Sequence, residues 1–289
     1  MKKIVGNNQY QKIANALLII QLLRKGANTR ASIARELGLQ PSTVTYSINR
    51  LIEAGLVHES NTPIRESTTP GRKAVSLEIN TDYGRIIGLE LLADSGWASI
   101  IDPTGQVLYS RPIEYPQIRE TDPRQRFELL ITQVIADVEL LCQGIPILGV
   151  GIALPGIVES NNSNVRDCWT HELKQCDLTS FITRSFPYPV ILENDANCCA
   201  QRYLFTDQIH QDTFMYLLAR QYPSAHLPSG VSPFGIGIGL VFNSLLYRGS
   251  SFRSGEFIST FVPVHETGRQ LSVMLDAVET LQEDRAIRH

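Results

Sequence analysis

An unbroken apolar segment in the middle of the chain, residues 147–154, limits the possible folds most strongly. It reads Ile-Leu-Gly-Val-Gly-Ile-Ala-Leu and ends at Pro155 and Gly156, which is typical of a buried strand. A second apolar strand, residues 190–195, runs directly into a helix expected at residues 196–205. Strands that alternate with helices predict an α/β domain, which we place at residues 81–289.

Other segments fit the same pattern. We expect strands at residues 84–92, 97–101 and 106–110, with a hairpin turn at Asp102-Pro103-Thr104-Gly105. A helix should begin at Pro123, because apolar residues then recur at helical spacing as far as Leu141. Residues 214–219 and 234–242 read as further strands, whereas the stretch that contains Cys168 and Cys176 reads as a loop.

The first 80 residues have a different pattern. A helix is expected at residues 10–25, a second after the N-cap Thr29, and a third from Pro41 or Ser42. Two short helices joined by a turn at Gly38 fit a helix-turn-helix. Strands in which apolar and polar residues alternate are expected at residues 56–59 and 74–79 and would form a wing. We therefore predict a winged helix-turn-helix domain at residues 1–80.

The polar face of the third helix is the candidate DNA-reading surface. Its side chains can reach base edges or phosphates, and they are Ser42, Thr43, Thr45, Tyr46, Asn49 and Arg50. Arg72 and Lys73 in the wing would contact the DNA backbone or the minor groove. The alternative is an ordinary helical hairpin with a solvated polar face.

Charge is distributed unevenly along the chain. Residues 1–80 carry 11 Lys or Arg against 5 Asp or Glu, a net charge of +6, whereas the remainder carries 15 against 24, a net charge of −9. A basic N-terminal domain on an acidic larger one suggests a polyanionic partner, namely double-stranded DNA. A chance imbalance of surface charge would give the same numbers.

Several motifs of the larger domain resemble the ROK family (repressor, open reading frame, kinase). The pentapeptide Glu193-Asn194-Asp195-Ala196-Asn197 matches the most recognisable motif of that family. It is preceded by the Pro155-Gly156 turn and followed, in the family's order, by residues 235–241, 247–249 and 255–256. With a winged domain in front, the chain resembles a ROK transcriptional repressor from about Arg30 to Leu281.

This resemblance implies a fold and a site. The fold would be actin-like (ribonuclease-H-like), with two lobes around a sugar cleft. Asn194, Asp195 and Glu256 would contact the sugar, and Asp195 matches the general base of the family's sugar kinases. Asn194 and Asp195 could equally serve as the N-cap of the helix that follows.

The elements that bind ATP in the family's kinases are altered here. The Asp-x-Gly-Gly-Thr loop is replaced at residues 88–94 by Gly-Leu-Glu-Leu-Leu-Ala-Asp, and the second loop has Ile236 where a hydroxyl should stand. Glycines alternating with isoleucine favour close strand packing over phosphate binding. We therefore expect no enzyme activity, with a sugar kinase that carries a DNA-binding domain as the alternative.

The zinc site that the resemblance implies is also altered, so we expect no cofactor. The positions of its His and three Cys ligands hold Ser259, Gln270, Ser272 and Ala277, none of which supplies a thiolate or imidazole. Cys168, His171 and Cys176 are a weaker candidate set, because no fourth ligand is evident.

The sequence also indicates partners and setting. Five cysteines and the absence of an apolar run of 18 residues or more favour a reduced, cytoplasmic protein. We expect a homodimer or higher homo-oligomer that represses carbohydrate-related genes, with a sugar or sugar phosphate as a possible effector. A ligand-blind DNA-binding dimer is a further alternative. The chain ends soon after the altered zinc segment, so the second lobe is expected to be shortened relative to the family.

Overall fold

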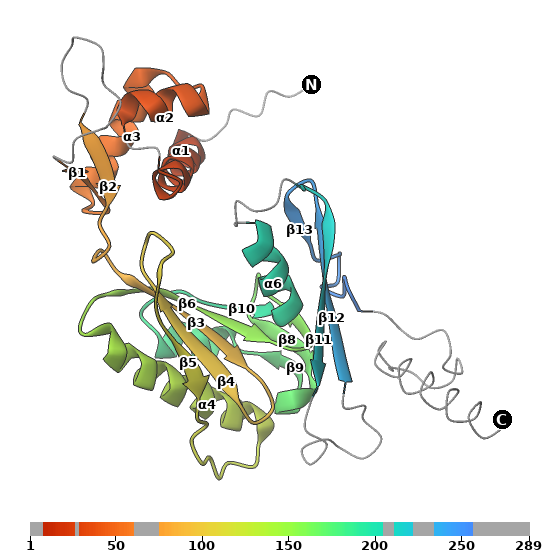
Figure 1. Cartoon of the computed structure of the whole chain (residues 1–289). Helices are drawn as coiled ribbons and strands as arrows, with labels where there is room; N and C mark the ends of the chain where they lie inside the picture. The colour runs from red at the N-terminus through yellow and green to blue at the C-terminus, as the bar shows by residue number, and fades with distance from the viewer. Residues whose placement is uncertain (1–7, 27–28, 61–74, 205–210, 222–233, 257–289) are drawn as a thin grey trace, which may run out of the picture. The chain divides into compact units, whose positions relative to one another are not determined.

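The computed structural model describes residues 8–26, 29–60, 75–204, 211–221 and 234–256 (Figure 1). Internal contacts divide the chain into two compact units. The first is built on residues up to 86 together with residues 100–109 and 142–148, and the second on residues 87–99, 110–141 and those from 149 onward.

The N-terminal elements are three helices and a hairpin. They are α1 (Asn8–Arg24), α2 (Arg30–Leu37), α3 (Pro41–Glu53), β1 (Val57–Ser60) and β2 (Ser76–Ile79). The two strands pair antiparallel with Val57 opposite Ile79 and Ser60 opposite Ser76. This is the predicted helix-turn-helix followed by a wing hairpin, and the tip of the wing lies outside the described residues.

Local rules explain where these helices begin and end. The Thr29 hydroxyl accepts a hydrogen bond from the Ser32 amide (3.0 Å), and the Ser32 hydroxyl accepts one from the Thr29 amide (3.1 Å), which closes a capping box. Gly38 ends α2 in the left-handed conformation with φ +61°, where glycine is least strained. Pro41 occupies the first turn of α3, where its missing amide hydrogen costs nothing.

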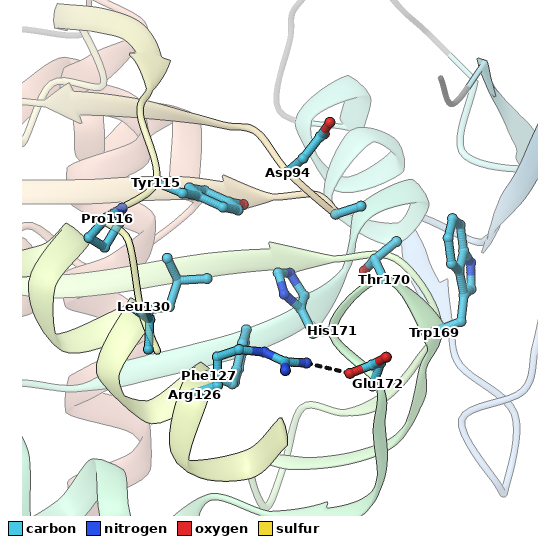
Figure 2. Close-up of a pocket in the computed structure, with 12 residues that line it drawn as sticks. Asp94, Tyr115, Pro116, Arg126, Phe127, Leu130, Trp169, Thr170, His171 and Glu172 are labelled. Carbon is cyan, nitrogen blue, oxygen red and sulfur yellow. Dashed lines mark hydrogen bonds and ion pairs between the residues drawn. The ribbon is translucent and has the colours of Figure 1, made fainter. Parts of the chain in front are cut away.

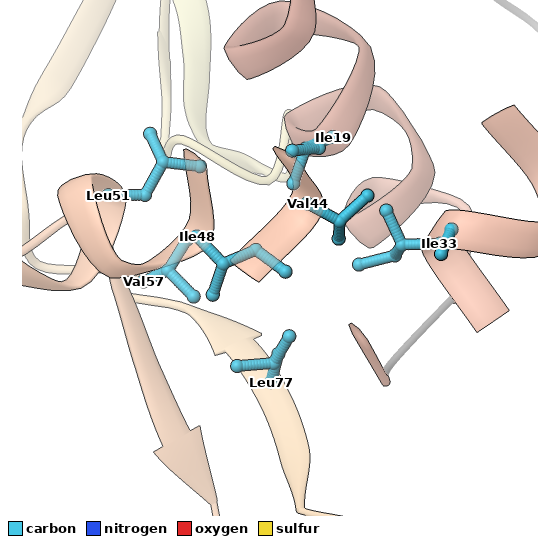
Figure 3. Close-up of a cluster of buried hydrophobic side chains, with 8 residues drawn as sticks. Ile19, Ile33, Val44, Ile48, Leu51, Val57 and Leu77 are labelled. Carbon is cyan, nitrogen blue, oxygen red and sulfur yellow. The ribbon is translucent and has the colours of Figure 1, made fainter. Parts of the chain in front are cut away.

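One apolar cluster holds the N-terminal elements together (Figure 3). Ile19 of α1, Ile33 of α2, and Val44 and Ile48 of α3 are fully buried. Each such side chain contributes about 1.5–3 kcal/mol of hydrophobic free energy. The hairpin adds Val57 and Leu77 to this cluster, and α3 adds Leu51.

The larger domain is built on a five-stranded sheet in the order β10-β6-β3-β4-β5. Its strands are β3 (Arg85–Leu91), β4 (Gly96–Ile101), β5 (Val107–Ile113), β6 (Ile147–Leu154) and β10 (Val190–Asn194). Strand β10 runs parallel to β6, with Asn194 beside Leu154, so both strands end at the same edge. The Asp102 carboxylate accepts hydrogen bonds from the Thr104 and Gln106 amides (2.9 and 3.0 Å), which forms the predicted turn between β4 and β5.

Helix α4 (Pro123–Glu139) confirms the helical spacing, because it buries every apolar residue of its stripe from Phe127 to Val138. It is capped by Asp122, whose side chain accepts from the Gln125 amide. A 3₁₀ turn, η1 (Leu140–Cys142), follows it.

The segment expected to be a loop around Cys168 and Cys176 is a small antiparallel sheet instead. Its strands are β7 (Ile157–Glu159), β8 (Asn164–Cys168) and β9 (Leu173–Asp177), and the 3₁₀ turn η2 (Trp169–His171) joins the last two. The prediction failed because these strands hold only three to five residues each. At that length alternation is hard to recognise in a sequence.

The remaining described elements are two helices and a further antiparallel sheet. Helices α5 (Thr179–Ser185) and α6 (Asp195–Leu204) flank β10 in the chain, and a three-stranded antiparallel sheet follows. Its strands are β11 (Phe214–Gln221), β12 (Phe234–Phe242) and β13 (Leu245–Tyr247), in that order. Strand β12 packs on α6, and a Cβ placed on Gly239 would lie 2.6 Å from the Ala200 side chain, so the glycine permits this close approach.

Candidate functional sites

Helix α3 presents the predicted DNA-reading face to solvent. Ser42, Thr45, Tyr46, Asn49 and Arg50 are exposed and Thr43 is half-buried. Val44, Ser47 and Ile48 are buried on the opposite side. The hydroxyls, the amide and the guanidinium therefore lie together on the face that the fold leaves free for a groove.

Lys12 and Arg30, two cations that the sequence analysis did not include, lie beside this face. The Lys12 ammonium lies 5.7 Å from the Tyr46 ring centre, and the predicted Arg50 guanidinium lies 6.0 Å from the same ring. Arg30 donates to the Asn49 side-chain oxygen (3.2 Å) and pairs with Glu59 (2.8 Å). Lys12 comes from α1 and Arg30 from the start of α2, so only the packing of the three helices brings them to α3. Arg72 and Lys73 of the wing lie outside the described residues.

The second candidate site is at the shared edge of β6 and β10. Asn194, Asp195 and Glu256, the residues expected to contact a sugar, line one cavity of about 40 Å³. The other lining residues are Pro155, Gly156, Trp169, Leu218, Arg220, Gly235, Ile236 and Gly237. Ligand pockets commonly measure roughly 300–1,000 Å³, so this cavity is far smaller than a usual ligand site. In this conformation it has room for only a few water molecules.

Asn194 has the capping role that was the alternative to sugar contact. Its side-chain oxygen accepts from the Asn197 amide (3.0 Å) at the first turn of α6, and its side-chain nitrogen donates to the Gly156 carbonyl (2.9 Å). Both ends of the amide are therefore engaged while its edge lines the cavity.

Asp195 is held by a cation that sequence reasoning also missed. One carboxylate oxygen accepts from the Ala196 amide (2.8 Å), and the other accepts from Arg220 Nε (3.1 Å). Arg220 also pairs with Glu90 at the end of β3. Burial raises the pKa of the Asp195 carboxyl, and the Arg220 charge acts in the opposite direction. Asp195 thus carries a hydrogen-bonded counter-ion at Oδ2, while Oδ1 accepts from the first turn of α6.

Glu193 is fixed just as tightly one residue before the site. Arg248 donates to Glu193 Oε2 through Nε and Nη2 (2.8 and 2.6 Å), and Asn197 donates to Oε1 (3.1 Å). The pair ties β10 to the segment after β13, and a charge-assisted contact of this kind orients the β10–α6 junction.

Comparison with known proteins decides the family. Residues 86–258 match the model of the ROK family, and residues 15–58 match that of winged helix-turn-helix DNA-binding domains. The chain belongs to the ROK family. It combines an N-terminal winged helix-turn-helix with an actin-like ROK domain, as the sequence motifs predicted.

The similar proteins include transcription regulators. The xylose repressor of Bacillus spizizenii is 28% identical over 255 residues, covering 85% of this chain and 59% of that protein. The DNA-binding transcriptional dual regulator NagC of Escherichia coli is 23% identical over 257 residues, covering 87% of this chain and 58% of that protein. The chain thus spans less than two thirds of the length of these relatives.

A solved structure supports the fold. A crystal structure of a ROK family transcriptional regulator, a homologue of the E. coli MLC protein, superposes with a TM-score of 0.68. The superposition covers 95% of this chain and 69% of that one at 22% identity.

The segments that correspond to the ATP-phosphate loops of ROK kinases make a turn and a packing contact in this structure. At the first, the Leu92 amide donates to the Ser95 carbonyl (2.9 Å) and so closes a turn. At the second, a Cβ on Gly237 would lie 2.9 Å from the Ala196 side chain, so this glycine serves strand–helix packing.

The four positions that would hold the family's zinc ligands are not among the described residues. Ser259, Gln270, Ser272 and Ala277 lie beyond the described residues, so the expectation of no zinc remains a prediction. Within the ranges that the structure describes, no three His, Cys, Asp or Glu side chains gather as a metal site. Burial raises the pKa of Cys168 to about 11, which disfavours the thiolate that a metal needs. In the same ranges, no helix has the length and apolarity to span a bilayer.

Proposed function

We propose that this ROK protein is a sequence-specific DNA-binding transcriptional regulator that represses carbohydrate-related genes. The observation that carries the proposal is the exposed polar face of α3, which stands on a fully packed three-helix core and is flanked by cations from all three helices. Arg50 is exposed on α3, Lys12 stands over Tyr46, and Arg30 holds Asn49. Side-chain amides and hydroxyls read base edges, and cations neutralise phosphates.

The protein acts as a homodimer in this proposal. A single recognition helix reads few base pairs, whereas two domains related by a two-fold axis read two half-sites and multiply affinity. The xylose repressor among its relatives supports a sugar effector. The sugar would bind at Asn194, Asp195 and Glu256 and shift the balance between two arrangements of the DNA-binding domains.

The ROK domain binds the sugar without phosphorylating it. A general base must accept a proton from the attacking hydroxyl, and the Arg220 charge beside Asp195 Oδ2 lowers the proton affinity of that carboxylate. The alternative is a sugar kinase, which the family motif around Asp195 favours. Incubation with ATP, Mg²⁺ and a hexose panel separates the two. Turnover that disappears in Asp195→Asn would overturn the non-catalytic assignment.

DNA binding is tested by fluorescence anisotropy with a duplex from the gene's own upstream region and a scrambled duplex. We expect the native duplex to bind more tightly, and affinity to fall steeply between about 50 and 200 mM salt. Arg50→Ala should weaken binding to both duplexes and lower by about one the slope of log affinity against log salt concentration. Thr45→Ala should instead reduce the difference in affinity between the native and the scrambled duplex. Arg119→Ala, an exposed cation of the second unit, is the charge-matched control.

Each outcome is decisive. Equal binding of both duplexes, or no effect of either α3 substitution, would remove the DNA-reading role. Specific binding that no sugar alters would retain that role and favour the ligand-blind dimer.

A further inference from the structure

A second and larger cavity lies beside the Asp195 cavity in the same unit (Figure 2). We call it the Trp169 pocket. It measures about 410 Å³, within the range of ligand pockets, and its wall is built from α4, η2 and the segments that follow β3 and β5. Trp169 lines both cavities, so the two are neighbours across one indole ring.

The inner wall of the pocket is aromatic and already in place. The His171 ring lies 4.8 Å from the Phe127 ring and 6.5 Å from Tyr115, centre to centre. The Tyr115 hydroxyl donates to the Leu92 carbonyl (3.1 Å), which leaves the flat ring to the pocket. Burial lowers the pKa of His171 to about 4, so the imidazole is neutral near pH 7 and the wall carries no charge.

The rim of the pocket is polar. Arg126 and Glu172 form an ion pair of 2.5 Å, and Figure 2 shows Asp94 on the opposite side of the pocket. Side chains of this kind exchange hydrogen bonds with hydroxyl groups, and aromatic faces pack on the C–H surface of a ring. A sugar ring, which has hydroxyl groups at its edge and C–H groups on its faces, therefore suits both the polar rim and the aromatic inner wall.

We propose that the Trp169 pocket binds the second ring of a disaccharide whose first ring occupies the Asn194, Asp195 and Glu256 cavity. This inference rests on the proposed sugar-binding function. The first cavity, at about 40 Å³, is smaller than a sugar ring, so a sugar enters it only if lining side chains move apart. A second ring in the pocket supplies contact free energy that offsets the cost of this movement.

The experiment uses Trp169 itself as the probe. The chain has two tryptophans, and Trp97 lies on β4, where it donates to the Ser110 hydroxyl. Trp97→Phe therefore leaves Trp169 as the sole indole of the full-length protein. Its fluorescence is titrated with glucose and cellobiose, xylose and xylobiose, and N-acetylglucosamine and its β-1,4 dimer. We expect one disaccharide to bind at least tenfold more tightly than its monosaccharide.

Filling the pocket should remove only this advantage. Ala93→Phe inserts a ring into it, and the disaccharide should then bind no better than the monosaccharide, whose dissociation constant stays within about twofold. Ile118→Phe tests the same wall from another side if Ala93→Phe fails to unfold cooperatively. Gln117→Phe is the matched control, because Gln117 is exposed and lies outside the pocket.

The outcomes separate the two proposals. A monosaccharide response without any disaccharide advantage, or an advantage that survives both filled variants, overturns the Trp169 pocket and leaves the sugar effector intact. An unchanged Trp169 signal with all six sugars overturns both. A tenfold advantage that only the filled variants abolish establishes the pocket.

Discussion

Replacement of Arg220 by methionine tests the electrostatic basis of the Asp195 site. Arg220 donates to Asp195 through Nε (3.1 Å) and also pairs with Glu90. The Asp195 side chain is 6% exposed and that of Arg220 is 20% exposed, so the pair is largely screened from water. Arg220→Met keeps much of the apolar stem but leaves the buried carboxylate without its counter-ion.

The expected loss of stability follows from this burial. Removing one partner of a buried ion pair costs about 3–5 kcal/mol, because the remaining charge stays buried. Partial exposure of Arg220 and of Glu90 lowers this, and we expect about 2–3 kcal/mol near pH 7.5. Without Arg220, the pKa of Asp195 rises further above its unfolded value. The deficit should therefore be nearly absent near pH 4 and grow as pH rises through the folded-state pKa.

Guanidinium unfolding of the wild type and of Arg220→Met, each at several pH values, measures this dependence. Asp195→Asn and the double variant complete a mutant cycle, in which the neutral amide should restore most of the loss. Arg248→Met, which removes the counter-ion of Glu193, is the matched control and should lose stability without any rescue by Asp195→Asn. A deficit that is independent of pH, or that Asp195→Asn leaves unchanged, would refute the reasoning.

Three further perturbations test other parts of the molecule. Gly239→Ala should cost about 1–3 kcal/mol in urea unfolding, since its Cβ would lie within 2.7 Å of α6 atoms; Gly88→Ala, which meets nothing within 4 Å, should be nearly neutral. His171, with a pKa of about 4 when folded, should make the wild type lose up to about 3 kcal/mol as pH falls from 6.5 to 4, and His171→Gln should flatten that slope. Ile48→Ala should cost about 2–5 kcal/mol and abolish DNA binding on unfolding of its domain, whereas Ile13→Ala, at a position 51% exposed, should do neither. A Gly88→Ala variant as unstable as Gly239→Ala would contradict the close packing of β12 on α6. A pH slope that His171→Gln leaves unchanged would contradict the burial of His171. An Ile48→Ala variant as stable as the wild type would contradict the role of Ile48 in the N-terminal core.

The N-terminal domain was predictable almost entirely from the sequence. Its helices are fixed by signals that act over one to four residues: the Thr29 cap, the Gly38 stop and the apolar spacing of α3. The same holds for the turn at Asp102 and for the exposed polar face that ends at Arg50. Such features need only the local backbone and a nearby core.

The Asp195 site was predictable only in part. The motif placed Asn194 and Asp195 at a strand-to-helix junction, and the structure has them there, with Glu256 on the same cavity. The motif did not reveal that Arg220 would neutralise Asp195. Nor could it decide between cap and sugar contact for Asn194, because both roles use the same side chain at the same turn.

The sequence by itself determined the helix-turn-helix, helix α4 and the five strands of the larger sheet, since these depend on periodicity and on short-range hydrogen bonds. Only the tertiary structure decided which distant groups meet. Arg220 is 25 residues from Asp195 and 130 from Glu90, and the Trp169 pocket joins segments from Ala93 to Glu172. Contacts at such separations are selected by how whole layers pack, because the cost of ordering the chain between them is recovered only when the complete core forms.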